Sequence, residues 1–243
     1  FAIRMRLYLI RHGQSVNNLL WTETQSDKGR SHDPELTTVG YLQAECVGKF
    51  LRYELPTRLP LGGLYNDAGL PTVLYTSLMT RAVETGRTIA RELNVPLVAL
   101  GEAFEAGGLY LKDELTGERQ GMPGPNRAHF ELHYPELALP DEVGDGGWYN
   151  RPAEGKEERP ERARRVWNEL LKRHGGTEDI VGLVTHGGFY NHLLAMLLHW
   201  ENRQDVWFTL NNCAVSRIDV TEHGIAFVYL NRFDFLPPEL VTL

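Results

Sequence analysis

Two short apolar segments, far apart in the sequence, each end in a His-Gly pair, and this repetition constrains the fold more than any other feature. The first is 6–10, followed by Arg11-His12-Gly13. The second is 180–185, followed by His186-Gly187-Gly188. Because ligands bind at the carboxyl ends of strands in open α/β sheets, two such strands would bring both histidines into one crevice. One histidine after a strand is a weak signal, whereas the pair is a strong one.

The rest of the chain alternates strand-like and helix-like segments. Strands are expected at 5–10, 73–76, 97–100, 180–185, 214–220 and 225–230. Helices are expected at 37–53, 78–93, 159–174 and 189–200. This order predicts an α/β sheet with helices on both faces. The length of 243 residues fits a single domain over 1–243.

Local signals add detail to two of these helices. Ser77 precedes the helix at 78–93 and is expected to cap its N-terminus. In the helix at 159–174, the i,i+4 spacing of Glu158 and Arg162 predicts an ion pair on a solvent-exposed face.

Composition excludes several classes of protein. Hydrophobic residues make up 42% of the chain, which argues against disorder. No apolar run approaches the ~20 residues that span a bilayer, and the start does not resemble a signal peptide. The two cysteines argue against a disulfide scaffold, so a cytoplasmic location is expected. With a net charge of −7, the chain is not expected to bind nucleic acid, and an anionic substrate would need a local group of arginines.

One long segment, 106–158, interrupts the alternation and is rich in glycine and proline. Long segments of this kind often form lids or binding elements, so we expect an insertion that acts on substrate choice. Arg119, Arg127 and Arg151 are candidate contacts, although a surface arginine is the commoner role for each.

Four residues carry the chemistry expected at the crevice. Arg11 and Arg81 are candidate clamps, because a guanidinium matches the oxygens of a phosphoryl group. Arg81 falls in the first turn of a helix, where a cation is disfavoured unless an anion lies nearby. His12 is the candidate nucleophile, and His186 is the candidate donor to the phosphoryl oxygens.

A proton donor is also needed for the leaving oxygen. The segment 101–108 follows a predicted strand and offers two carboxyl groups. Glu105 is our choice as general acid and then base, and Glu102 is the alternative. Either could instead be a solvated loop residue.

Four motifs together resemble the histidine phosphatase superfamily, also called the phosphoglycerate mutase-like superfamily. They lie at 11–18 (Arg-His-Gly-Gln-Ser-Val-Asn-Asn), 33–44, 77–85 and 185–188, in the family order. The usual proline is absent from 77–85, and the acid segment at 104–108 is shorter than in most relatives.

The resemblance implies a three-layer α/β/α sandwich with a mostly parallel central sheet. It also implies a phosphohistidine on His12, with Arg11, Arg81 and His186 completing the phosphate pocket. Asn18 would touch the phosphoryl group as well. Neither a metal nor another cofactor is expected.

The predicted function is a metal-independent phosphomonoesterase that hydrolyses a small phosphorylated metabolite. Ser15 and Gly187, within the same motifs, are further candidates for binding the substrate. Segments 21–32 and 105–110 do not reproduce the mutase branch of the family, which favours a phosphatase. A mutase and a non-catalytic protein that binds a phosphorylated ligand are the alternatives. The expected partners are the small substrate and a second copy in a homodimer, with neither nucleic acid nor membrane.

Overall fold

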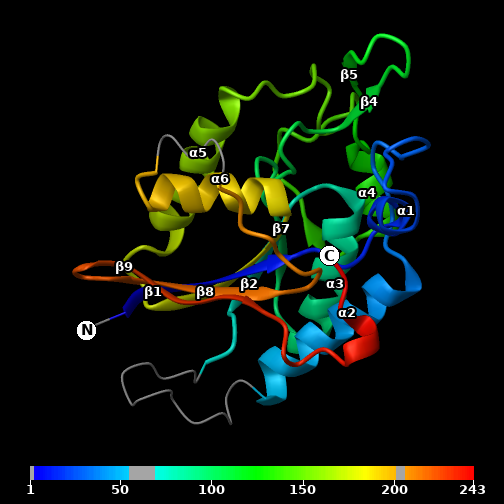
Figure 1. Cartoon of the computed structure of the whole chain (residues 1–243). Helices are drawn as coiled ribbons and strands as arrows, with labels where there is room; N and C mark the ends of the chain where they lie inside the picture. Colours follow the sequence, from blue (N-terminus) through cyan, green and yellow to red (C-terminus); the bar gives the residue numbers. More distant parts are fainter. Residues whose placement is uncertain (1–2, 55–68, 201–205) are drawn as a thin grey trace.

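A computed structural model describes residues 3–54, 69–200 and 206–243 (Figure 1). Its main sheet consists of β1 Ile3–Arg11, β2 Val73–Thr76, β3 Leu97–Ala99, β6 Leu137–Ala138, β7 Asp179–Thr185, β8 Val215–Thr221 and β9 Gly224–Arg232. The strand order is β6-β3-β2-β7-β1-β8-β9. The strands from β6 to β1 run parallel, and β8 and β9 add two antiparallel pairings at one edge. The predicted mostly parallel sheet is therefore confirmed.

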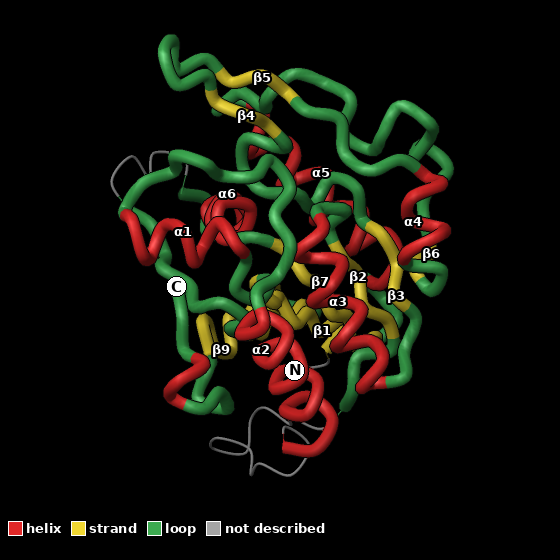
Figure 2. Tube along the Cα trace, turned by 90° about the vertical axis from the view of Figure 1, so that its right-hand side faces the viewer, coloured by secondary structure: helices red, strands yellow, loops and turns green. Residues whose placement is uncertain are grey.

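Helices cover both faces of this sheet (Figures 1 and 2). They are α1 Val16–Thr24, α2 Thr38–Lys49, α3 Thr80–Leu93, α4 Arg127–His133, α5 Glu158–His174 and α6 Gly187–Leu197, with a π-helical turn at Phe50–Glu54 and a 3-10 turn at Pro238–Leu240. Helices α2 and α3 pack on one face, and α5 and α6 pack on the other. None of the helices in the described part of the chain is long and apolar enough to cross a membrane.

The central strand β1 shows why three layers form. Tyr8 and Ile10 point into the core beneath α2 and α3, whereas Met5, Leu7 and Leu9 point into the core beneath α5 and α6. Successive side chains of a strand alternate between faces, so a largely apolar strand can be buried on both sides. All five of these side chains are almost completely buried.

Two local predictions about the helices are wrong. Helix α3 begins at Thr80, and its N-cap is Met79, not Ser77. The Ser77 hydroxyl instead accepts a hydrogen bond from the Met79 amide and contacts a histidine described below. Arg162 is only 1% exposed and pairs with Glu154, not with Glu158, because this side of α5 faces the protein interior.

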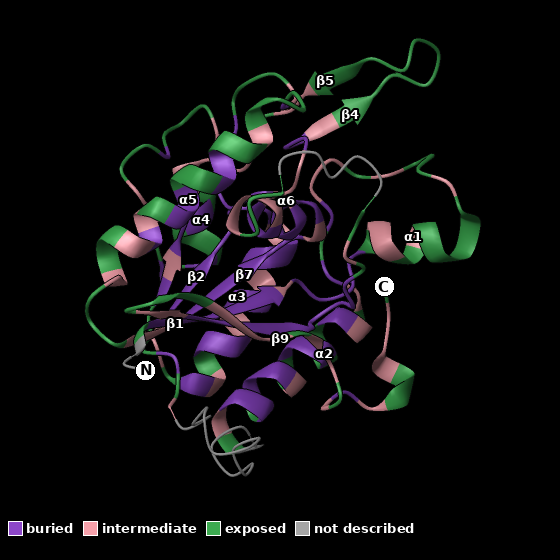
Figure 3. Ribbon diagram, turned by 60° about the vertical axis from the view of Figure 1, so that its left-hand side comes forward, coloured by how far each residue is buried: buried purple, intermediate pink, exposed green. Residues whose placement is uncertain are grey.

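The insertion at 106–158 has two different parts. Strands β4 Tyr110–Lys112 and β5 Arg119–Gly121 form an exposed hairpin away from the main sheet (Figure 3). The later part carries α4 and β6 and joins the core, where Phe130 and Leu137 are buried. Only the hairpin therefore stands apart from the body of the fold.

Candidate active site

His12 and His186 lie side by side where the adjacent strands β1 and β7 end. Arg11 is paired with Thr185 in the parallel register of these strands, and the next residue of each strand is a histidine. The His12 amide donates to the Thr185 carbonyl at 2.9 Å. Both rings are buried, and their centroids are 5.0 Å apart. The structure thus places both histidines together, as the paired motifs predict.

The hydrogen bonds of His12 fix which ring nitrogen carries its proton. Nδ1 lies 2.7 Å from the Gly13 carbonyl oxygen, which can only accept, so Nδ1 is assigned as the donor. Burial and the charges of Arg81 and Arg11 lower the pKa of His12 well below its ordinary value. The imidazole is therefore neutral near pH 7, with the lone pair of Nε2 available to attack an electrophile.

Two arginines, the buried Arg81 and the half-buried Arg11, lie around this lone pair. Arg81 Nε donates to His12 Nε2 at 3.1 Å, and an attack on phosphorus requires this contact to be replaced. Arg11 Nη1 donates to the Leu210 carbonyl, while its Nε is buried with no hydrogen-bond partner. Burial lowers the pKa of Arg11 to about 10, so its guanidinium stays charged at neutral pH.

His186 is held by Ser77. Its Nε2 lies 2.9 Å from the Ser77 hydroxyl, which also accepts a hydrogen bond from the Met79 amide. The hydroxyl can donate its proton to Nε2, and in that tautomer the imidazole proton lies on Nδ1. Nδ1 is buried without a hydrogen-bond partner, so it can donate to a ligand beside His12. Burial, followed by the charge of Arg81, lowers the pKa of His186 well below its usual value.

Glu105 lies at the N-terminus of α6. Its Oε1 accepts hydrogen bonds from the amides of Ala106 and Phe189, whereas its Oε2 forms none with any described residue. A Cβ on Gly188 would come within 2.2 Å of Glu105 Oε1, so only glycine leaves room for the carboxylate. Glu102 is placed elsewhere: it pairs with Arg165 at 2.8 Å and lines a separate cavity.

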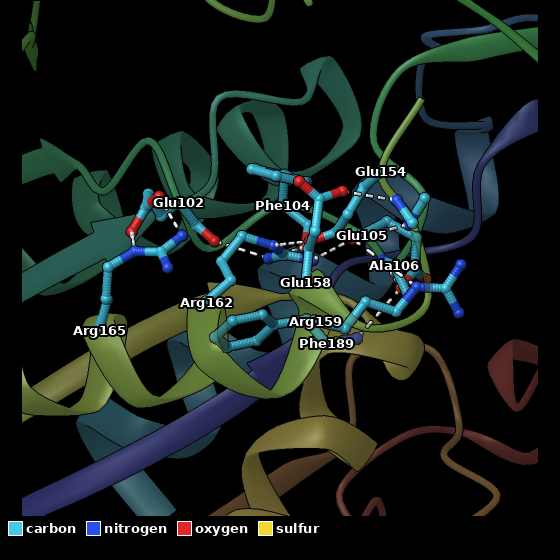
Figure 4. A network of polar contacts seen from close by, with 12 residues as sticks. Glu102, Phe104, Glu105, Ala106, Glu154, Glu158, Arg159, Arg162, Arg165 and Phe189 are labelled. Carbon is cyan, nitrogen blue, oxygen red and sulfur yellow. Dashed lines mark hydrogen bonds and ion pairs between the residues drawn. The ribbon is translucent and has the colours of Figure 1, made fainter. Parts of the chain in front are cut away.

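A buried ion pair holds the segment that carries Glu105 (Figure 4). Arg162 donates to both carboxylate oxygens of Glu154 and to the carbonyls of Glu102 and Phe104. Glu154 in turn accepts from the Gly107 amide at 3.0 Å. These contacts fix both ends of the turn that presents Glu105. The sequence gives no signal for this clamp, because Phe104 lies 58 residues from Arg162 and Gly107 lies 47 residues from Glu154.

Close backbone contacts hold the loop that follows His12. A Cβ on Gly13 would lie 2.5 Å from the Gly40 carbonyl oxygen, so the loop approaches the start of α2 too closely for any side chain. The Gly13 amide donates to the hydroxyl of Thr85 on α3. From the opposite side, Asn212 donates to the His12 carbonyl at 3.2 Å. Thr85 and Asn212 are positioning residues with no recognisable role when each is considered alone.

The remaining predicted binding residues also lie near His12. Ser15 and Asn18 form a capping box at the start of α1, which occupies the Ser15 hydroxyl and Asn18 Oδ1. The backbone amide of Asn18 donates to the Ser15 hydroxyl, whereas the side-chain nitrogen Nδ2 forms no hydrogen bond with a described residue and can donate to a ligand. Gly187 lies beside Arg11, whose Nε is 3.8 Å from where a Gly187 Cβ would stand.

These side chains enclose a cavity of about 390 Å³. It is lined by Arg11, His12, Ser15, Asn17, Asn18, Arg30, Pro34, Arg81, Glu105, Ala106, Tyr110, Arg119, Arg159, Gly188 and Trp207. A second cavity of about 800 Å³ adjoins it and contains Gly187, Trp21 and Phe208. Of the three insertion arginines considered from the sequence, Arg119 lines the His12 cavity, whereas Arg127 and Arg151 do not.

The lining residues are suited to a phosphoryl group. Two buried guanidinium groups, the N-terminus of α6 and a histidine donor surround a neutral imidazole, with a carboxyl group nearby. Among the described residues, no group of three or more His, Cys, Asp or Glu side chains is arranged to hold a metal ion. The fold and site define a class of α/β proteins with an arginine-lined pocket around a buried, neutral histidine at the carboxyl ends of the central strands.

The family model of the histidine phosphatase superfamily (branch 1) matches residues 7–232. The chain therefore belongs to this superfamily, as its four motifs suggest. A search of curated proteins finds no match.

Several solved structures share the fold at low sequence identity. An Entamoeba histolytica phosphoserine phosphatase mutant in complex with phosphoserine has a TM-score of 0.59 and 18% identity, with 96% of this chain and 100% of that chain covered. A mycobacterial glucosyl-3-phosphoglycerate phosphatase has a TM-score of 0.58 and 18% identity, with 94% and 99% covered. The alpha-ribazole phosphatase from Shigella flexneri has a TM-score of 0.58 and 18% identity, with 94% and 96% covered.

Proposed function

We propose that the protein is a phosphatase that hydrolyses a small phosphorylated metabolite through a phosphohistidine on His12. One observation carries the proposal: a buried, neutral His12 lines a cavity with Arg11 and Arg81, and its Nε2 carries a lone pair that accepts a hydrogen bond from Arg81. Membership of the histidine phosphatase superfamily supports it. So do the three solved relatives, which are named as phosphatases of small phosphorylated compounds.

In the first step, Nε2 of His12 attacks phosphorus and the bond from phosphorus to the leaving oxygen breaks. Glu105 gives its proton to that oxygen, and the alcohol departs. Arg11, Arg81 and Nδ1 of His186 stabilise the negative charge on the phosphoryl oxygens. The Gly13 carbonyl accepts the Nδ1 proton of His12 throughout, which keeps the ring oriented.

In the second step, water attacks the phosphohistidine and the phosphorus–nitrogen bond breaks. Glu105, now a carboxylate, takes a proton from the water, and inorganic phosphate leaves. The cycle restores neutral His12 and protonated Glu105. No step requires a metal ion. A cytoplasmic location and a homodimer stay predictions from the sequence.

The test is hydrolysis of p-nitrophenyl phosphate in excess chelator, with the wild-type protein and His12→Ala compared. We expect turnover that survives the chelator and disappears in the variant. A rapid quench should trap a phosphoryl group on His12 in the wild type, detected by mass spectrometry under alkaline conditions. Turnover lost on chelation would contradict metal independence, and a requirement for bisphosphoglycerate priming would indicate a mutase.

A further inference from the structure

Three arginines that the proposed phosphoryl chemistry does not use line the same cavity as His12. Arg30 comes from the loop after α1, Arg119 from β5 and Arg159 from the first turn of α5. The cavity therefore contains five arginines and one carboxyl group, Glu105. In a chain with a net charge of −7, this local excess of positive charge favours anions at one place.

The protein leaves two of these three charges unpaired. Neither Arg30 nor Arg119 forms an ion pair with any residue that the structure describes. Arg159 forms an ion pair with Glu154 at 3.8 Å, but that carboxylate also binds Arg162 more closely through both oxygens. The guanidinium groups of Arg30 and Arg119 are thus available to an anionic ligand, and the charge of Arg159 is shared with a carboxylate that already has a closer partner.

Unpaired donors point to the same place. Nε of Arg30 and Nε of Arg159 are buried with no hydrogen-bond partner, as are Nε of Arg11 and Nδ1 of His186 in the phosphoryl pocket. Buried donors in proteins nearly always have an acceptor. A ligand that reached from the phosphoryl pocket to Arg30 and Arg159 would supply the missing acceptors.

Tyr110 holds two of the arginines in position. The guanidinium groups of Arg30 and Arg119 lie 4.7 Å and 4.6 Å from the centre of its ring. Arg30 also donates to the Tyr110 hydroxyl at 3.0 Å. A Cβ on Gly107 would lie 3.0 Å from the Tyr110 ring and 3.6 Å from Arg119, so the pair packs directly against the turn that carries Glu105. Guanidinium groups held against an aromatic ring are preorganised to bind a carboxylate or a phosphate.

The position relative to Glu105 decides which part of the substrate these arginines meet. Arg159 lies next to Glu105 and Ala106 on the cavity wall (Figure 4). In the proposed function, Glu105 protonates the leaving oxygen, so the alcohol part of the substrate extends toward Arg159 and the β4–β5 hairpin. A group on that alcohol would therefore face the three arginines.

We propose that Arg30, Arg119 and Arg159 form a second anion subsite, and that the preferred substrate is a phosphomonoester whose alcohol part carries a carboxylate or a second phosphate. The orientation of this substrate rests on the proposed function. The subsite itself rests on the five arginines, their unpaired donors and the Tyr110 stack.

The test measures binding by calorimetry in a His12→Ala background, where turnover is blocked. The ligands are 3-phosphoglycerate and glycerol 3-phosphate, which share a three-carbon chain and differ in a carboxylate against a hydroxymethyl group. We expect at least tenfold tighter binding of 3-phosphoglycerate. Arg119→Gln and Arg159→Gln should each reduce this preference by about tenfold, since each removes a charged hydrogen-bond donor.

Two matched controls remove a charge from the same elements without lining the cavity. Lys112→Gln lies on the β4–β5 hairpin and Arg164→Gln lies on α5, and both side chains are exposed. Each should keep the preference of the parent protein. Because Arg119 is itself exposed, Arg119→Gln is expected to fold, and its thermal unfolding curve checks this.

Equal affinity for the two ligands, or a preference unchanged in Arg119→Gln and Arg159→Gln, would overturn the subsite. So would a failure of 3-phosphoglycerate to bind. Tighter binding of 2,3-bisphosphoglycerate than of 3-phosphoglycerate would support the subsite and identify its group as a phosphate. Turnover of p-nitrophenyl phosphate by the wild type tests the proposed function separately, so an arginine-dependent preference without turnover would support the subsite and contradict the phosphatase.

Discussion

The floor and the rim of the cavity are built in different ways. The floor consists of Arg11, His12, Arg81 and His186, at strand ends and in the first turn of α3, and all except Arg11 are less than 10% exposed. The rim consists of Arg30, Arg119 and Arg159, from a loop, a hairpin and the edge of α5. Every floor residue lies on an element that belongs to the core of the fold, whereas the hairpin of the rim stands outside it.

The contacts that hold the two regions differ in strength. Backbone groups of neighbouring strands and helices hold the floor, as in the bond from the His12 amide to Thr185. Among the described residues, the rim loop and hairpin are joined by side chains alone: the hydrogen bond from Arg30 to Tyr110 at 3.0 Å, and two exposed ion pairs, Lys28–Glu114 at 3.8 Å and Lys112–Asp27 at 4.0 Å. Exposed pairs contribute about 0–1 kcal/mol. The chemistry is therefore fixed by the fold, and the segments that would select the substrate can change without cost to it.

Among changes to the floor, removal of the proposed nucleophile should have the largest effect on turnover. His12→Ala is expected to lower kcat for p-nitrophenyl phosphate by about 10⁴-fold or more, because no other group can form the covalent intermediate. His129→Ala, on α4 and outside this cavity, should keep wild-type turnover. A His12→Ala variant that kept a tenth of the wild-type activity would contradict the role of His12 as the nucleophile.

The general acid should follow. Glu105→Gln is expected to lower kcat for an alkyl phosphate by about 10²–10⁴-fold. The loss should be smaller for p-nitrophenyl phosphate, since p-nitrophenolate leaves without protonation. Glu102→Gln is the matched control, because that carboxylate pairs with Arg165 away from His12. The opposite pattern, with Glu102→Gln slow and Glu105→Gln active, would reassign the acid.

Sequence predicts the floor well for a physical reason. Each floor residue belongs to a short motif at a strand end or in a helix turn, and parallel strands bring their carboxyl ends to one edge of the sheet. The register of Arg11 against Thr185 then places His12 beside His186. The motifs and the order of the strands are therefore enough to predict that these residues meet.

The rim and the supporting contacts cannot be predicted in the same way. No motif around Arg30 or Arg159 in the sequence indicates that these two side chains line the same cavity. Arg162 shows how spacing can mislead: it stands four residues from Glu158, yet the tertiary contact with Glu154 and the acid segment decides its place. Ser77 likewise stands near a helix start but serves His186.

Breaking the Arg162–Glu154 clamp that holds the Glu105 segment should have an intermediate effect on turnover. Arg162→Met leaves the buried Glu154 carboxylate with only the longer ion pair to Arg159, which is expected to lower the free energy of unfolding by about 3 kcal/mol. We also expect kcat to fall by roughly tenfold, because Glu105 loses the support of its turn. Urea unfolding and turnover check both. Arg165→Met, which breaks the exposed pair with Glu102, should cost only about 0–1 kcal/mol.

The smallest expected effect is on the pH dependence of stability, to which the histidines of the floor contribute and the arginines of the rim do not. The pKa values of His12 and His186 in the folded protein are depressed by burial, whereas an unfolded histidine titrates near 6.5. As the pH falls through 6.5, the unfolded chain binds these protons first, so the stabilising contribution that is complete above 6.5 is lost below it. Each histidine should then cost about 1 kcal/mol of unfolding free energy between pH 6.5 and 5.5.

Urea unfolding at these two pH values tests this assignment. His186→Asn should reduce the pH-dependent loss of stability by the share of one histidine, whatever its effect on stability at pH 7.5. Arg119→Gln should leave the loss unchanged, because an arginine keeps its charge throughout this range. If His186→Asn showed the same loss as the wild type, His186 would not be buried in its neutral form, and the tautomer that directs Nδ1 toward the substrate would lose its support. The sensitivity of folding to pH would then have to come from His12 or from groups outside the floor.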